Sequence, residues 1–517
     1  MQTFEIMNAS MPLLTLLVAV PLIGSAFLTI PAVRNYGRIF AVVVSVIELV
    51  ISLVAFIVFF DWSTPASYQL VESYSWIPQM GVSWALGVNA LGAVMLLLAV
   101  ALVPVVLVAG WSEDAHPRSG GAYAGWVLLL EAFMVLIFAA FDVVVFYIAF
   151  EAMLIPLYVM IGRYGRGEPE ARRAAAMKFL LFSLAGGLAM LGGLVALWGW
   201  APTAARETGT FFRLDSLAML ASNLSGSVQL GVFVTFMIAF AIKAPMVPVH
   251  TWLPDTAAVA RPGTSVLLVG VLDKIGTFGM ITLCLPLFPA ACAQARWVVI
   301  ILAVISILWG GLAAIGQNDI MRLVSYTSVS HFGFMVLGTF IGTSIALVGA
   351  MFYMVAHGVS IAAMFLLSGW LAERGETADM NHYSGMQRVT PVLAGLWLIS
   401  GLASVALPGL SGFVPEYLVL MGTWQVNIVV AIFAVFGVVI AALYLLLPYQ
   451  RVFTGKAHRD VEKITDLGGR ERAVMVPLIA AMLILGIWSA PLVTAVTPVA
   501  DAVVVPVSSS ALEGSSK

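Results

Sequence analysis

Apolar runs long enough to cross a lipid bilayer follow one another through most of this chain. Hydrophobic residues make up 62% of its 517 residues and charged residues only 10%, whereas soluble domains carry about a quarter charged residues. About 20 apolar residues form a helix that crosses the roughly 30 Å hydrocarbon core. The sequence therefore predicts an all-α polytopic membrane protein with about 14 transmembrane helices and no strand pattern. The expected spans are 11–31, 38–60, 84–110, 121–139, 141–162, 172–200, 229–249, 263–287, 297–315, 320–341, 344–372, 390–421, 428–449 and 472–494.

Positively charged residues divide unevenly between the alternating loops of this arrangement. Of the 24 Lys and Arg residues, 18 fall in one set of loops, two lie within spans, and the other loops hold only Arg206, Arg213, Arg296 and Lys517. Cytoplasmic loops are enriched in Lys and Arg. With an even number of spans both termini lie on one side, so we expect a multi-pass protein with both termini on the extracytoplasmic side.

Three ionisable side chains lie inside apolar runs. Lys243 follows GVFVTFMIAFAI, Lys274 lies in GVLDKIGTFG, and Glu151 lies in FDVVVFYIAFEAMLIPLYVMIG. An ionisable group in hydrocarbon costs about 3 kcal/mol on insertion scales, and such a group usually marks a proton or ion pathway. The alternative is an inert buried ion pair, or side chains that extend to the headgroups.

Three of the six histidines fall within or at the ends of the expected spans: His250, His331 and His357. Histidine titrates near neutral pH, so a membrane histidine can carry a proton or relay a hydrogen bond. Taken alone, each of them is better explained as a structural histidine whose hydrogen bonds are satisfied in the core.

Prolines interrupt two of the apolar runs. Pro245 and Pro248 follow Lys243, and Pro408 and Pro415 precede Glu416. A proline removes a helical hydrogen bond, and broken helices at matching places in two halves are typical of inverted-repeat transporters. Breaks in the seventh and twelfth spans predict two inverted five-helix repeats. The expected organisation is helices 1–3 in 1–120, the first repeat (helices 4–8) in 121–290, the second (helices 9–13) in 291–450, a cytoplasmic loop and the last helix in 451–505, and a disordered tail in 506–517.

The sequence contains no motif that would bind a cofactor. The two cysteines, Cys284 and Cys292, cannot hold an iron–sulfur cluster by themselves, and there is no CxxCH haem motif. There is also no Gly-rich phosphate loop and no basic block for nucleic acid. We therefore expect no redox, nucleotide or metal cofactor on this chain, and two reduced, buried cysteines.

Several motifs in order resemble the antiporter-like proton-translocating membrane subunits of respiratory complex I, over about residues 85–455. AFAIKAPMVPVHTWLPD is similar to the family's lysine–x–proline and histidine–x–tryptophan–leucine–proline motif. The family's residues then fall on Lys243, Pro245, His250, Trp252, Leu253 and Pro254. FDVVVFYIAFEAMLIPLYVMIGRYG is similar to its fifth-helix signature, with the glutamate at Glu151. The eighth-helix lysine falls on Lys274, and two later stretches place histidines at His331 and His357. Two of the three antiporter-like subunits carry lysine in the twelfth helix, whereas this chain has Glu416. In this respect the chain resembles the third of them, the middle subunit.

The resemblance implies a non-redox subunit of an enzyme that oxidises NADH with quinone and exports protons across a bacterial cell membrane. FMN, iron–sulfur clusters and quinone would then reside in partner subunits, and two further antiporter-like subunits would flank this chain in the bilayer. Protons would pass through a horizontal relay of Glu151, Lys243, His250, Lys274, His331, His357 and Glu416. Mrp-type cation/proton antiporter complexes, which work without NADH, share the motifs and remain an alternative. A third possibility is a structural membrane spacer whose ionisable residues carry no protons.

Two residues depart from the family's pattern. In LPDTAAVARPGTS, many relatives have a histidine and an acidic or amide residue before the proline. Ala257 or its neighbours and Arg261 replace these here, so we assign no relay role to this segment. Asp273 directly precedes Lys274. Consecutive helical residues point about 100° apart, so Asp273 need not bond to Lys274.

Overall fold

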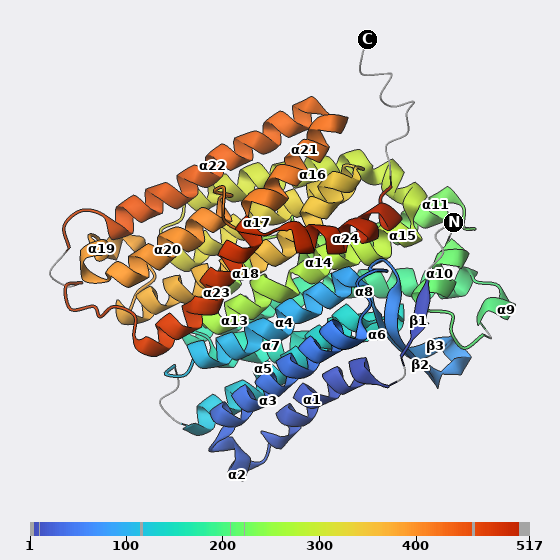
Figure 1. The fold of residues 1–517 in the computed structure, drawn as a ribbon, viewed down its shortest axis with the longest axis horizontal. Helices are drawn as coiled ribbons and strands as arrows, with labels where there is room; N and C mark the ends of the chain where they lie inside the picture. The colour runs from blue at the N-terminus through green and yellow to red at the C-terminus, as the bar shows by residue number, and fades with distance from the viewer. Residues whose placement is uncertain are drawn as a thin grey trace.

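Helices lie roughly side by side along most of the structure. This computed structural model describes residues 5–9, 11–113, 117–206, 208–221, 223–457 and 461–505. A small sheet lies at one end of the helical bundle and α19 (Met386–Val389) at the other (Figure 1). The tail expected at 506–517 lies outside the described residues.

The helices follow the order of the expected spans. The first are α1 (Leu13–Phe27), α2 (Pro31–Arg34), α3 (Gly37–Val54), α4 (Ala90–Ala109), α5 (Pro117–Ala139), α6 (Val143–Ala152), α7 (Leu154–Tyr164), α8 (Pro169–Trp200), α9 (Thr203–Arg206) and α10 (Leu214–Ala221). The middle ones are α11 (Gly226–Lys243), α12 (Trp252–Val259), α13 (Pro262–Leu267), α14 (Lys274–Gly279), α15 (Leu285–Leu287), α16 (Pro289–Ile315), α17 (Ile320–Phe340) and α18 (Ser344–Arg374). The last are α20 (Pro391–Ser404), α21 (Phe413–Val426), α22 (Ile428–Phe453), α23 (Gly469–Ile487) and α24 (Ala490–Val503).

The described residues contain 11 helices that are long and apolar enough to cross a membrane, or 12 if α23 and α24, which are bent by 69°, form one span. Two shorter apolar helices are α1 and α20. Each expected span falls on one of these helices or on a broken pair. The expected polytopic helical protein is thus confirmed.

The expectation of an all-α chain without strands is wrong. Strands β1 (Ile6–Asn8), β2 (Tyr68–Ile77) and β3 (Val82–Val88) form a sheet in that order, with β1 parallel to β2 and β2 antiparallel to β3. β3 is buried along nearly its whole length, so its apolar residues look like a continuation of α4. The expected span 84–110 therefore begins in a strand.

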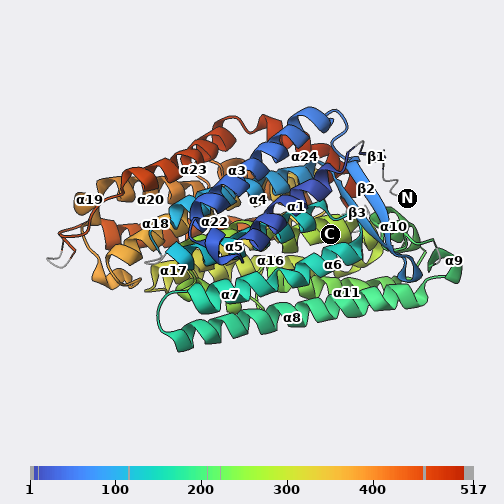
Figure 2. The ribbon, with the colours of Figure 1, turned by 90° about the horizontal axis from the view of Figure 1, so that it is seen from below.

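Two segments form the centre of the bundle. Both α18 and the segment Pro262–Leu287, which comprises α13 to α15, are completely buried along their most apolar stretch. Figure 2 shows α8 and α11 side by side along one face of the molecule, away from α23. The buried segments carry Lys274 and His357, so these side chains lie far from lipid.

Candidate functional site: a buried chain of ionisable side chains

Lys243 is the last residue of α11, and the next helix, α12, begins only at Trp252. The break expected at Pro245 and Pro248 is therefore present. The interrupted backbone finds side-chain partners: Trp252 Nε1 donates to the carbonyl oxygen of Ile242 at 3.0 Å, and Ser306 Oγ accepts from the Val247 amide at 3.0 Å. Such partners let irregular backbone exist at membrane depth.

The Lys243 ammonium is fully buried between two aromatic rings. Its Nζ lies 5.4 Å from the ring centroid of Phe150 and 5.3 Å from that of Phe179. No hydrogen-bond partner for this nitrogen exists among the described residues. Cation–π contacts and the negative end of the α11 dipole both favour its positive charge.

Glu416 occupies the opposite kind of helix end. The second expected break separates α20, which ends at Ser404, from α21, which begins at Phe413, and Glu416 lies in the first turn of α21. A helix N-terminus favours negative charge as a C-terminus favours positive charge. The C-terminal end of α11 therefore favours the positive charge of Lys243, and the N-terminal end of α21 favours the negative charge of Glu416.

A π-helical turn before Lys274 provides a backbone carbonyl oxygen that accepts a hydrogen bond from its side chain. In an α-helix the Asp273 amide would donate to the carbonyl of Val269, but here it donates to that of Leu268. The Val269 oxygen is thereby left for Lys274 Nζ, which donates to it at 2.6 Å. The same Nζ lies 2.8 Å from His357 Nδ1 on α18. Because an ammonium has no acceptor, Nδ1 accepts this bond.

Hydrogen bonds continue from His331 to Glu416 through a tyrosine. His331 Nδ1 lies 2.8 Å from the Tyr353 hydroxyl, which donates to Glu416 Oε2 at 2.8 Å. Since the hydroxyl proton points to Glu416, Nδ1–H of His331 is the donor to Tyr353, and Nε2 accepts from Tyr444 at 3.2 Å. The rings of His331 and His357 are 5.1 Å apart, centroid to centroid.

Glu151 lies on α6 and is only partly buried. Its Oε1 has no hydrogen-bond partner among the described residues. Gly187 of α8 lies against this oxygen.

His250 lies in the turn that precedes α12. Its ring lies 6.1 Å from that of Tyr326, and the positive charge of Lys178 acts on it. The structure thus brings Lys274, His331, His357 and Glu416 together, and the relay role of His250 stays a prediction.

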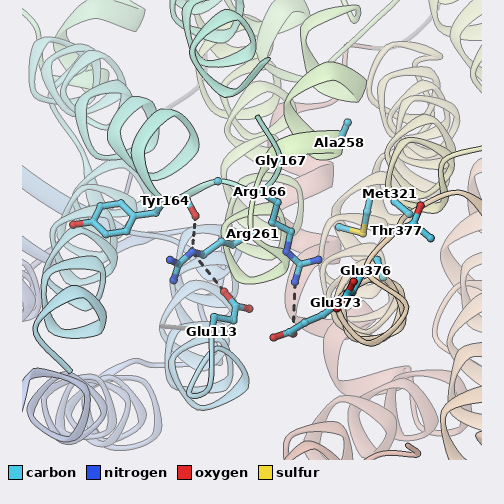
Figure 3. Close-up of a pocket in the computed structure, with 13 residues that line it drawn as sticks. Glu113, Tyr164, Arg166, Gly167, Ala258, Arg261, Met321, Glu373, Glu376 and Thr377 are labelled. Atoms are coloured by element: carbon cyan, nitrogen blue, oxygen red, sulfur yellow. Dashed lines mark hydrogen bonds and ion pairs between the residues drawn. The ribbon is translucent and has the colours of Figure 1, made fainter. Parts of the chain in front are cut away.

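Arg261, directly before α13, connects the end of α7 with the segment after α4 at the edge of a cavity of about 450 Å³. Its Nε donates to the carbonyl oxygen of Tyr164 at 2.6 Å and lies 3.7 Å from Glu113 Oε2 (Figure 3). Across the same cavity Arg166 pairs with Glu373 at 3.7 Å. These contacts give Arg261 a structural role.

Sequence reasoning missed Tyr353 and Tyr444. Tyr353 precedes His357 by four residues on the same helix, and residues spaced by four share a face. That spacing was the available signal for Tyr353. Tyr444 belongs to α22, and no local pattern relates it to His331.

Cys284 and Cys292 are free and buried, as expected, and Cys292 Sγ donates to the carbonyl oxygen of Cys284. In the part of the chain that the structure describes, no group of three His, Cys, Asp or Glu side chains could hold a metal ion. Whether the chain lacks every cofactor stays a prediction.

Two broken helices and two hydrogen-bonded groups of buried residues, Lys274 with His357 and His331 with Tyr353 and Glu416, whose histidine rings are in contact, define the class of membrane ion-translocating subunits. The comparisons with known proteins narrow this class. The chain matches the family described as "NADH:quinone oxidoreductase/Mrp antiporter, TM" over residues 140–441, and it belongs to that family.

Relatives and solved structures cover nearly the whole chain. NADH-quinone oxidoreductase subunit M of Mycobacterium tuberculosis (strain ATCC 25618 / H37Rv) is 41% identical over 95% of this chain and 94% of its own length. A chain of respiratory complex I from Thermus thermophilus is 31% identical with a TM-score of 0.84, covering 95% of this chain and 98% of its own. A chain of the Mrp complex from Dietzia sp. DQ12-45-1b has a TM-score of 0.83 at 22% identity over 95% and 97%, and shows the same fold.

Proposed function

We propose that this chain is subunit M of a bacterial NADH–quinone oxidoreductase and moves protons across the membrane. The observation that carries the proposal is the buried line in which Lys274 contacts His357, and His331 joins Glu416 through Tyr353. The similarity to relatives named subunit M supports the identity of the complex. The chain's part in the enzyme is translocation, without a redox step of its own.

Glu151 and Lys243 begin the proposed relay, and Lys274, His357, His331 and Glu416 continue it. A buried lysine holds its proton less tightly than one in water, and an approaching carboxylate restores that hold. A change of three pKa units corresponds to about 4 kcal/mol. Moving one charge across 100 mV costs about 2.3 kcal/mol. A change of that size, produced by movement of Glu151 relative to Lys243, would supply enough free energy to carry one proton against 100 mV.

The finer architecture belongs to the same proposal. Counting α1, the broken pair α20–α21 and the bent pair α23–α24 as one span each gives 14 spans, with inverted repeats at 121–290 and 291–450. The excess of Lys and Arg in one set of loops supports both termini on the extracytoplasmic side. Two further antiporter-like subunits would flank the chain, and FMN, iron–sulfur clusters and quinone would reside in other partners.

Purification of the tagged chain in mild detergent tests the assignment to this enzyme. We expect NADH–quinone reductase activity and iron–sulfur signals to co-purify. Isolation with other hydrophobic chains alone, together with proton exchange driven by Na⁺ or K⁺, would instead assign the chain to a cation antiporter.

Variants of the buried lysines test the relay. In the complex within sealed vesicles, Lys243→Ala and Lys274→Ala should each abolish most NADH-driven proton pumping. Lys463→Ala, which removes an exposed lysine, is the matched control and should pump normally. Pumping at the control rate in both buried-lysine variants would contradict the relay, and a loss of assembly alone would favour a structural spacer.

A further inference from the structure

Asp273 is a buried acidic residue that the relay described above does not use. Its side chain is fully buried, and neither carboxylate oxygen has a hydrogen-bond partner among the described residues. Burying a carboxyl group without a partner is costly. Ionisable residues that persist inside a membrane protein usually serve transport.

The packing of α14 shows which way Asp273 faces. A Cβ placed on Gly276 would lie 2.6 Å from both the Ala244 amide nitrogen and the Phe240 carbonyl oxygen. This face of α14 therefore lies directly on the broken end of α11. Residues three apart share a helix face, so Asp273 faces that end too, where Lys243 is the last helical residue.

Lys274 points elsewhere. It is one residue further along and so about 100° round the helix, and its Nζ reaches His357 on α18. Asp273 thus lies between the lysine of the broken helix and the lysine that begins the hydrogen-bonded line.

Charge complementarity agrees with this placement. The negative charge of the Asp273 carboxylate attracts both Lys243 and Lys274, whereas that of Glu151 acts on Lys243 alone of the two. Asp273 is therefore the acidic group that the two lysines share.

We propose that Asp273 carries the proton from Lys243 to Lys274, a step that rests on the relay proposed above. In the first transfer an N–H bond of the Lys243 ammonium breaks and an O–H bond forms on the Asp273 carboxylate, which leaves a neutral amine and a neutral carboxylic acid. In the second, that O–H bond breaks and an N–H bond forms on the neutral amine of Lys274, which restores the carboxylate. Rotation of the carboxyl group or a bridging water connects the groups, and no oxidant or reductant takes part.

Two substitutions at position 273 test the transfer in the assembled complex within sealed vesicles. Asp273→Asn keeps the shape but cannot take up and release a proton, and it should lower NADH-driven pumping at least tenfold. Asp273→Glu keeps the carboxyl group and should restore much of the rate. Wild-type pumping in Asp273→Asn, or equal losses in Asp273→Asn and Asp273→Glu, would overturn the proposal.

The lysine variants separate this failure from failure of the relay itself. If Lys243→Ala and Lys274→Ala stop pumping while Asp273→Asn pumps normally, only the role of Asp273 falls. If the lysine variants also pump normally, the proposed function falls with it.

An infrared measurement on the wild-type complex covers the case in which Asp273→Asn does not assemble. With aspartate labelled by ¹³C at its side-chain carboxyl, turnover should change a C=O band of a protonated aspartic acid, identified by its isotope shift. In Asp273→Glu the labelled band should disappear because glutamate carries no label. Absence of the band from the wild type, or its persistence in Asp273→Glu, would refute the transfer through Asp273.

Discussion

Gly187 leaves the space that the Glu151 carboxylate occupies. A Cβ at position 187 would lie 1.5 Å from Glu151 Oε1, so α8 can lie beside this carboxylate only without a side chain there. The obstructed atom is the far end of a flexible side chain. Glu151 can therefore move aside without unfolding of either helix.

Substitution of Gly187 by Ala should displace the Glu151 carboxylate and leave the fold intact. We expect normal assembly of the complex and a several-fold loss of NADH-driven proton pumping, because Glu151 loses its position relative to Lys243. Gly192→Ala on the same helix is the control, since a Cβ there meets nothing within 4 Å. Equal pumping by the two variants would show that the exact place of Glu151 is unimportant.

Tyr353→Phe should interrupt the line between His331 and Glu416. The change keeps the ring but leaves Nδ1 of one residue and Oε2 of the other without this partner, at a cost of about 1–3 kcal/mol in stability. Proton pumping in vesicles should fall several-fold. Tyr123→Phe removes another buried hydroxyl, bonded to Thr264 at 2.9 Å, and should pump at the wild-type rate. Undiminished pumping by Tyr353→Phe would argue that protons bypass this hydroxyl.

Asp255 should make stability depend on pH at the acidic end. It pairs with Lys178 at 2.6 Å and Arg322 at 2.7 Å and so ties α12 to α8 and α17. Burial acts to raise the pKa of the Asp255 carboxyl, but hydrogen bonds and charge from Lys178 and Arg322 outweigh it and hold the pKa below its usual value. A depressed pKa contributes stability above the unfolded value of about 3.9, and this contribution is lost as pH falls through the lower folded value.

Asp255→Asn should therefore lower the thermal unfolding midpoint at neutral pH by an amount equivalent to about 1 kcal/mol, as partly exposed pairs do. Its midpoint should also fall less steeply than that of the wild type below about pH 4. Thermal scans of the purified protein between pH 3 and pH 7 measure both effects. Parallel curves for the two proteins would rule out this contribution.

Gly276→Ala should force α14 away from the end of α11. The new Cβ would meet backbone atoms at 2.6 Å, which cannot rotate aside, and overpacking of this kind costs about 1–3 kcal/mol. We expect a lower thermal midpoint and slower pumping. Gly231→Ala, on α11 where a Cβ meets nothing within 4 Å, should match the wild type in both measurements.

Much of the fold follows from local sequence properties. Long apolar runs predicted the helices because backbone polar groups in lipid must pair within their own segment. Pro245 and Pro408 predicted the two breaks because proline lacks the amide that continues a helix. The strands β2 and β3 were missed because β3 is buried along most of its length and shows no alternation of polar and apolar residues.

The sequence by itself determined that the protein is helical and membrane-spanning, where its helices break, and which ionisable groups lie among apolar residues, because each of these depends on neighbouring residues. Only the tertiary structure decided which of those groups meet. It placed Tyr353 between His331 and Glu416 and turned Asp273 toward the end of α11. Such contacts join helices that are distant in the chain, and their geometry is set by packing, which no local pattern encodes.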